Sequence, residues 1–105
     1  MPKLLFRPKA EADLARLLIY IAQSSGSPER ANNYTRRIRS RCETLLTFPE
    51  SGHRRDDLRP GLSIIGFERR IVIAFKHLSS GDVEIGRVFY GGRNYEALLE
   101  RDKSV

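Results

Sequence analysis

The sequence contains very little cysteine and histidine. Its 105 residues include one cysteine, Cys42, and two histidines, so no internal disulfide can form and a structural zinc site lacks ligands. No segment approaches the roughly 20 apolar residues that span a bilayer, and the N-terminus lacks the apolar run of a signal peptide. These absences argue against export and membrane insertion, and they predict a protein of the reducing cytoplasm.

Signatures of cofactor-dependent or hydrolytic enzymes are also missing. There is no GxGxxG, and Gly91-Gly92 lacks the Lys-Ser/Thr that follows in a phosphate-binding loop. No Ser/His/Asp order or metal-ligand spacing stands out. Cys42 lies in an apolar helical stripe, which is typical of a core residue. We therefore expect no cofactor, no metal and no catalytic residues.

Positive charge is the dominant feature of the composition. Lysine and arginine together number 19 against 13 acids, which gives a net charge of +6 and a pI near 10.0. Fifteen of the 19 are arginine, whose planar guanidinium suits carboxylate and phosphate. This bias predicts an acidic or polyanionic partner without identifying it, and direct nucleic-acid binding is left open. The length and 40% apolar content favour one domain spanning residues 1–105.

Two amphipathic helices are expected after a short N-terminal strand over Lys3–Arg7. The first helix ends near Ser24–Gly26, and the second begins at Ser27, Pro28 and Glu29 and stops at Phe48-Pro49. The apolar stripe of the first comprises Ala10, Leu14, Leu17, Leu18 and Ile21. That of the second comprises Ala31, Tyr34, Ile38, Cys42 and Leu45. The short connection predicts an antiparallel helical hairpin.

The second half of the chain is typical of an antiparallel meander. A charged surface loop is expected over Glu50–Gly61, followed by strands over Leu62–Phe67, Arg70–Leu78 and Val83–Tyr90. A short helix, capped by Asn94 and carrying Tyr95, Leu98 and Leu99, follows the last strand. The predicted fold is a two-layer α+β domain. Its helical hairpin packs on a three- to four-stranded, mainly antiparallel sheet, with a short C-terminal helix.

The second helix carries a dense run of arginines with no acid between positions 30 and 41. At 100° per residue, Arg30, Arg37 and Arg41 line one edge of the apolar stripe, whereas Arg36 and Arg39 point away from it. The run is either a solvated helix face or an edge that binds an acidic partner.

Arg87 interrupts a strand that otherwise has the pattern of a buried one. A charge there must pair with an acid, extend to an edge, or line a groove on the sheet. Tyr90 and Arg93 flank the Gly91-Gly92 turn, and they can join Arg87 in one patch.

Histidine and arginine also occur together in the charged loop. Asp56 and Asp57 can neutralise Arg54 and Arg55 locally, so these residues fit a plain surface loop as well as a binding loop. A lone histidine such as His77, near the end of its strand, is more often solvent-facing than catalytic.

Four stretches, in this order, carry a resemblance over nearly the whole chain: Ala12–Leu14 through Tyr20-Ile21, Cys42–Leu45 leading to Phe48–Gly52, Arg55–Leu62, and Gly86–Asn94. Their order and spacing resemble the ParE branch of the ParE/RelE toxin superfamily, the plasmid stabilisation toxins. The resemblance implies the fold predicted above. It also implies the toxin component of a type II toxin–antitoxin system, which poisons DNA gyrase and blocks replication without being an enzyme.

The resemblance also implies a partner: a ParD-like antitoxin whose acidic C-terminal segment wraps the toxin and neutralises it. For the target we predict contacts from Arg87, Tyr90 and Arg93. For the antitoxin we predict contacts along the helical hairpin and the exposed sheet margin, from Arg30, Arg37, Arg41, Leu18 and Tyr34. The family usually has His-Gly where this chain has Tyr90-Gly91, so this position can alter potency or target choice.

Two alternatives accompany this hypothesis. The RelE branch cuts messenger RNA on the ribosome, for which His53, His77 and Tyr90 are the available acids or bases besides the carboxylates. The charge-stabilising candidates are Arg54, Arg55, Arg87 and Arg93. The other alternative is an inactive relative that only binds its antitoxin.

Overall fold

The structure is a computed structural model that describes residues 1–92 and 94–102. Its elements are, in chain order, β1 (Leu4–Phe6), α1 (Pro8–Ser25), α2 (Pro28–Thr47), the 3-10 turn η1 (Pro49–Ser51), β2 (His53–Arg54), β3 (Leu62–Phe67), β4 (Ile71–His77), β5 (Val83–Tyr90) and α3 (Tyr95–Arg101). The predicted helices and the three main strands are confirmed to within a few residues. The α+β class is confirmed as well.

The sheet has five strands in the order β1-β5-β4-β3-β2 and is antiparallel except for the parallel pair of β1 and β5. The fifth strand is β2, which arises in the segment predicted to be only a charged loop. Its two residues, His53 and Arg54, pair with Ile64 and Ser63. The prediction missed β2 because two polar residues have no strand pattern of their own, and the edge of β3 supplies the hydrogen-bonding partner.

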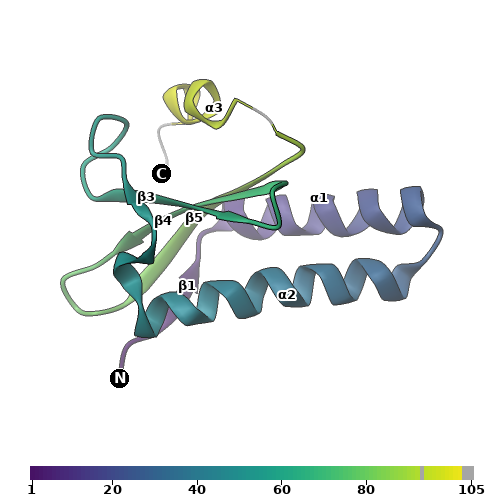
Figure 1. Ribbon diagram of the computed structural model, residues 1–105, viewed down its shortest axis with the longest axis horizontal. Coiled ribbons are helices and arrows are strands. Elements are labelled where there is room, and N and C mark those ends of the chain that lie inside the picture. The colour runs from purple at the N-terminus through teal and green to yellow at the C-terminus, as the bar shows by residue number, and fades with distance from the viewer. Residues whose placement is uncertain (93, 103–105) are drawn as a thin grey trace.

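The helical hairpin covers one face of this sheet (Figure 1). Gly26, at φ 68°, ends α1 in the left-handed conformation that glycine adopts without strain. Ser27 then caps α2 by accepting a hydrogen bond from the Arg30 amide at 3.2 Å. The core between the layers includes Leu14, Ile38 and Phe75, all 2% exposed or less. No helix among the described residues is long and apolar enough to cross a membrane.

The short helix α3 lies against the opposite face of the sheet (Figure 1). Asn94 caps it as predicted, because its side chain accepts a hydrogen bond from the Ala97 amide at 3.2 Å. Leu99 is fully buried in a second apolar cluster with Leu62 and Phe89. The sheet is therefore covered on both faces near its centre, by the hairpin below and by α3 above.

Candidate partner-binding surface

Strand β5 continues beyond the end of its neighbour β1, and Asp13 of α1 occupies the edge that this leaves. The parallel pairing stops at Phe6 and Ile85. Three residues further along β5, the Val88 amide donates to Asp13 Oδ2 at 2.9 Å. An acid in α1 thus replaces a missing strand as the acceptor for a buried amide.

The same aspartate pairs with Arg87. The guanidinium donates to Asp13 Oδ2 at 2.8 Å and to Asp13 Oδ1 at 3.0 Å, while Arg16 donates to Oδ1 at 2.6 Å. The side chains of Arg87 and Asp13 are 14% and 6% exposed. The hydrogen bonds to Asp13 raise the pKa of Arg87 above its ordinary value. Arg87 thus satisfies the first of the three alternatives that the sequence left open, pairing with an acid.

The Arg87 guanidinium also donates to Asp102 just after α3, whose carboxylate accepts a second bond from Lys9 at 2.8 Å. We call Lys9, Asp13, Arg87 and Asp102 the aspartate–Arg87 network. It joins α1 to β5 and to the end of α3, two elements that lie more than 70 residues further along the chain. A direct contact of Arg87 with the target stays a prediction.

Tyr90, two residues beyond Val88 on β5, lies in a cluster of three tyrosines. Its ring centroid is 5.6 Å from that of Tyr20 on α1 and 6.5 Å from that of Tyr34 on α2. These spacings are typical of favourable edge-to-face and tilted aromatic pairs. The structure therefore joins Tyr90, predicted to bind the target, to Tyr34, predicted to bind the antitoxin.

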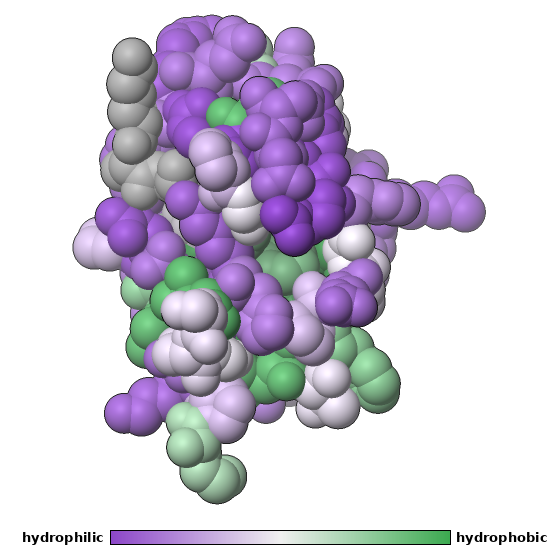
Figure 2. All heavy atoms as spheres, turned by 90° about the vertical axis from the view of Figure 1, so that its left-hand side faces the viewer, coloured by the Kyte–Doolittle hydropathy of each residue, from purple (hydrophilic) through white to green (hydrophobic). Residues whose placement is uncertain are grey.

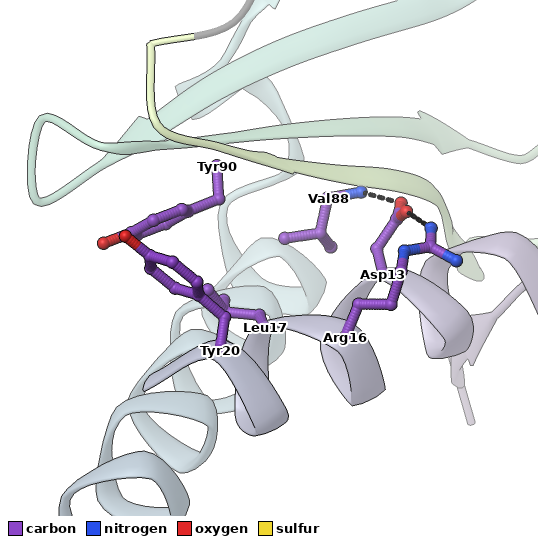
Figure 3. Close-up of a pocket in the computed structure, with 6 residues that line it drawn as sticks. All are labelled: Asp13, Arg16, Leu17, Tyr20, Val88 and Tyr90. Atoms are coloured by element: carbon purple, nitrogen blue, oxygen red, sulfur yellow. Dashed lines mark hydrogen bonds and ion pairs between the residues drawn. The ribbon is translucent and has the colours of Figure 1, made fainter. Parts of the chain in front are cut away.

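A pocket of about 170 Å³ opens beside Tyr90 between α1 and β5. Figure 3 shows the Tyr20 and Tyr90 rings together at one end, and Arg16 with Asp13 at the other. Leu17 and Val88 form the apolar part of its lining. Tyr20 is 54% exposed. An aromatic and apolar recess beside a cation can accept an apolar anchor from a protein partner.

Arg37 extends the tyrosine cluster along α2. Its guanidinium lies 5.1 Å from the centroid of the Tyr34 ring. It also pairs with both oxygens of Glu68, at 3.0 and 2.9 Å. We call Tyr20, Tyr34, Tyr90 and Arg37 the tyrosine–arginine surface.

The Tyr34 hydroxyl is the buried part of this surface. The oxygen is buried and has no hydrogen-bond partner among the described residues. Burial, with smaller contributions from Glu68 and Tyr90, raises the pKa of Tyr34. The hydroxyl therefore stays protonated and contributes no charge to the surface.

The remaining predicted antitoxin contacts are spread along the hairpin. Leu18 is half-buried and lines two shallow grooves between α1 and α2. Arg30 is exposed near the start of α2. Arg41 donates to Thr44 on its own helix. Among the five predicted residues, Arg37 and Tyr34 are in direct contact with each other.

One helical-wheel prediction is wrong. Arg39 was expected to point away from the apolar stripe, but it donates to Glu11 of α1 at 2.6 Å and lies 4.9 Å from the centroid of the Phe6 ring. The long side chain reaches β1 and the start of α1, because α2 packs beside both.

Most ion pairs of the charged loop are local, as the plain-surface alternative expected, but Arg55 also reaches α3. Arg54 pairs with Asp56 at 2.7 Å, and Arg55 pairs with Asp57 at 2.9 Å and with Glu96 at 2.5 Å. The bonds to Asp57 and Glu96 raise the pKa of Arg55, and the bond from Arg54 lowers that of Asp56. Figure 2 shows hydrophilic side chains across the upper part of this end of the molecule and hydrophobic ones gathered lower down.

The loop also forms one wall of a cleft of about 410 Å³. Arg54, Ser63 and His77 line this cleft together with Glu50. His53 pairs with Ile64, whose side chain belongs to the apolar cluster under α3, so it lies on the opposite face of the sheet. The proposed acids and bases His77, His53 and Tyr90 are therefore not assembled in one site.

No cluster suited to metal binding occurs among the described residues. Cys42 is fully buried, as predicted, and burial raises the pKa of its thiol to about 12. A thiol with that pKa is neutral and unreactive at neutral pH.

Sequence reasoning missed three important residues. Asp13 and Tyr20 lie within the stretches that carry the family resemblance but have no predicted role of their own, and Asp102 has no predicted role either. Each acts through a partner at least 15 residues away in the chain or in another element. The predicted target contact Arg93 lies outside the described residues.

Comparisons with known proteins agree with the fold. The family model described as ParE toxin of type II toxin-antitoxin system, parDE, matches residues 4–95. Nine chains of solved structures match. One of them is from a structure described as the chromosomal ParDE toxin–antitoxin system from P. aeruginosa. It has a TM-score of 0.72 at 24% identity, covering 86% of this chain and 96% of that one. No curated protein sequence matches.

Proposed function

Since this chain belongs to the ParE toxin family of type II toxin–antitoxin systems, we propose that it poisons DNA gyrase and blocks replication until an antitoxin neutralises it. The observation that carries this proposal is the family match over residues 4–95. In this proposal the chain works by binding, and the residues that act are those that contact its two partners.

The pocket beside Tyr90 supports a protein target. Tyr90 and Tyr20 supply large apolar area with few rotatable bonds, which favours their use as interface anchors. Arg16 at the pocket rim keeps most of its surface exposed, with its side chain 67% accessible while it pairs with Asp13. We assign Tyr90 and Arg93 to direct contact with the target. Arg87 contributes to target binding at least partly in an indirect way, because its ion pair with Asp13 holds β5 against α1.

The hairpin surface supports an acidic antitoxin. The chain has a net charge of +6, and Arg30 and Arg37 are exposed along α2. Leu18 lies between the helices in grooves that an apolar side chain can enter. An acidic segment that folds on this surface buries apolar area and pairs with arginines at the same time.

The cleft that joins Arg54 and His77 favours ribosome-dependent RNA cleavage as a second candidate. A cation and an imidazole in one cleft are two of the groups that phosphodiester cleavage needs. His53 and Tyr90, the other candidates, lie elsewhere. We therefore rank this function below gyrase poisoning.

Plasmid supercoiling by purified gyrase tests the proposal, run beside cleavage of messenger RNA on programmed ribosomes. Loss of supercoiling with trapped, cleaved DNA is the expected result. Tyr90→Ala should weaken that inhibition, and Tyr95→Ala, a change of the same size on α3, serves as the control. Cleaved RNA with normal supercoiling would replace this proposal by the RNase alternative. No effect in either assay would indicate a relative that only binds its antitoxin.

A further inference from the structure

The turn that joins β3 to β4 has an unusual backbone. It comprises Glu68, Arg69 and Arg70, and the first two have φ angles of 50° and 64°. Consecutive residues in the left-handed region are normally glycine, asparagine or aspartate, because a longer side chain is strained there. A strained backbone persists only when surrounding contacts hold it, and such positions cluster at functional sites.

Arg37 provides the contact that holds this turn. Its bidentate ion pair with Glu68, at 3.0 and 2.9 Å, joins the turn to the middle of α2. A second contact comes from the Gly91 amide, which donates to the Arg70 carbonyl at 3.0 Å. The turn is thus fixed between α2 and the residue that follows Tyr90.

The arginines of the turn are exposed and available. Arg69 and Arg70 are both exposed, and within residues 1–92 and 94–102 neither has an ion-pair partner. Arg70 is close enough to Tyr34 for its charge to favour the ionised form of that tyrosine. The turn therefore adds two free positive charges to the border of the tyrosine–arginine surface.

The combined surface has the chemistry of a site for an acidic segment with apolar anchors. Arg37 and Glu68 neutralise each other, so Arg69 and Arg70 leave an excess of positive charge. Tyr20 and its neighbour Ile19, which are 54% and 56% exposed, supply apolar area nearby. Solvated carboxylates can pair with the two arginines while apolar side chains contact the rings.

We propose that the turn 68–70 and the tyrosine–arginine surface together dock the acidic segment of the antitoxin, which thereby covers Tyr90 and competes directly with the target. The proposal rests on the function proposed above and adds its mode of regulation. In this arrangement the strained turn presents Arg69 and Arg70 to the antitoxin. The antitoxin then neutralises the toxin by occupying a surface that the target also needs.

Calorimetric titration with the full-length cognate antitoxin tests the docking surface. Arg69→Glu combined with Arg70→Glu should raise the Kd by at least about 30-fold, because it reverses two charges that face the acidic segment. The matched control is Arg36→Glu with Arg101→Glu, which changes the net charge equally at two exposed sites; it should stay within about threefold. Equal effects in the two variants, or no effect in either, would overturn the proposal.

The variant Arg69→Gly separates binding from structure. Glycine relieves the positive φ, so the Tm should rise while antitoxin affinity falls. A higher Tm with unchanged affinity would mean that Arg69 has no docking role, and it would overturn the proposal.

Competition is tested by adding gyrase to the immobilised toxin–antitoxin complex. Failure of gyrase to join the complex, together with its capture by free toxin, is the expected result. A stable ternary complex would overturn the shared-surface proposal alone. Absence of gyrase binding by free toxin would instead refute the proposed target, and the titration above, which contains no gyrase, would still decide whether the turn docks the antitoxin.

Discussion

Two neighbouring regions of the molecule, one around Arg87 in β5 and one around Tyr90 at the end of that strand, use arginine in opposite ways. In the aspartate–Arg87 network, Arg87 is 14% exposed and its guanidinium is shared between two buried carboxylates. On the tyrosine–arginine surface and the adjoining turn, the cations are exposed, and Arg69 and Arg70 have no ion-pair partner in the described part of the chain. A buried arginine with its donors used holds the fold together, whereas an exposed one beside aromatic rings can serve a partner.

The largest effect is expected from breaking the network. Arg87→Ala should lower the free energy of unfolding by about 3–5 kcal/mol, because it removes the cation that the buried carboxylates of Asp13 and Asp102 share. Urea denaturation followed by circular dichroism measures this loss. Arg36→Ala on the exposed face of α2 is the control, with an expected change within about 0.5 kcal/mol. Similar small losses in both variants would mean that the two regions do not differ in this way.

A binding measurement tests whether the arginines on the outer face of α2 serve a partner. Arg37→Glu with Arg41→Glu should weaken antitoxin binding by about 2–3 kcal/mol if these arginines are desolvated in the complex. Because Arg37 also holds Glu68, the charge swap Arg37→Glu with Glu68→Arg is the matched variant that keeps an ion pair in place. Affinity unchanged in the first variant would identify a solvated helix face.

The stability that the buried face of α2 contributes should depend on pH. Burial raises the pKa of Cys42 to about 12, so between its unfolded pKa and that value the unfolded chain releases a proton that the folded chain keeps. The free energy of unfolding contributed by Cys42 should therefore fall as pH rises above about 9, by at most about 1.4 kcal/mol per pH unit. Cys42→Ala should lose this component in denaturation series from pH 8 to 10.5. Parallel pH profiles for the two proteins would contradict a raised thiol pKa.

The smallest effect is expected at Tyr34. Its buried hydroxyl has no partner among the described residues, so Tyr34→Phe should change the free energy of unfolding by less than about 1 kcal/mol, and in the stabilising direction. Antitoxin affinity should be preserved because the ring remains beside Arg37 and Tyr90. A marked loss of affinity would show that the antitoxin uses the hydroxyl, and the surface would then include a polar anchor.

Local patterns were sufficient for most of the secondary structure. The apolar stripe containing Ile38 and Cys42, the Ser27 cap and the Asn94 cap are all properties of a few neighbouring residues, and each was found where predicted. Strand β2 was missed because its two polar residues become a strand only by pairing with Ile64 and Ser63. The parallel neighbour of β5 likewise depends on a contact between the two ends of the chain.

For the candidate site, the sequence identified the residue types that matter and the tertiary structure decided their roles. Arg87, Tyr90, Tyr34 and Arg37 were all singled out from sequence, but the sequence left Arg87 with three alternatives and assigned the other three to two separate partners. The choice depended on Asp13, which lies 74 positions from Arg87, and on the packing of α1 and α2 that places Tyr20 and Tyr34 against Tyr90. Helical and strand periodicity follow from each residue's near neighbours. The partner of a buried charge and the contacts of an aromatic ring depend on which distant segments fold together, and only the assembled structure fixes these.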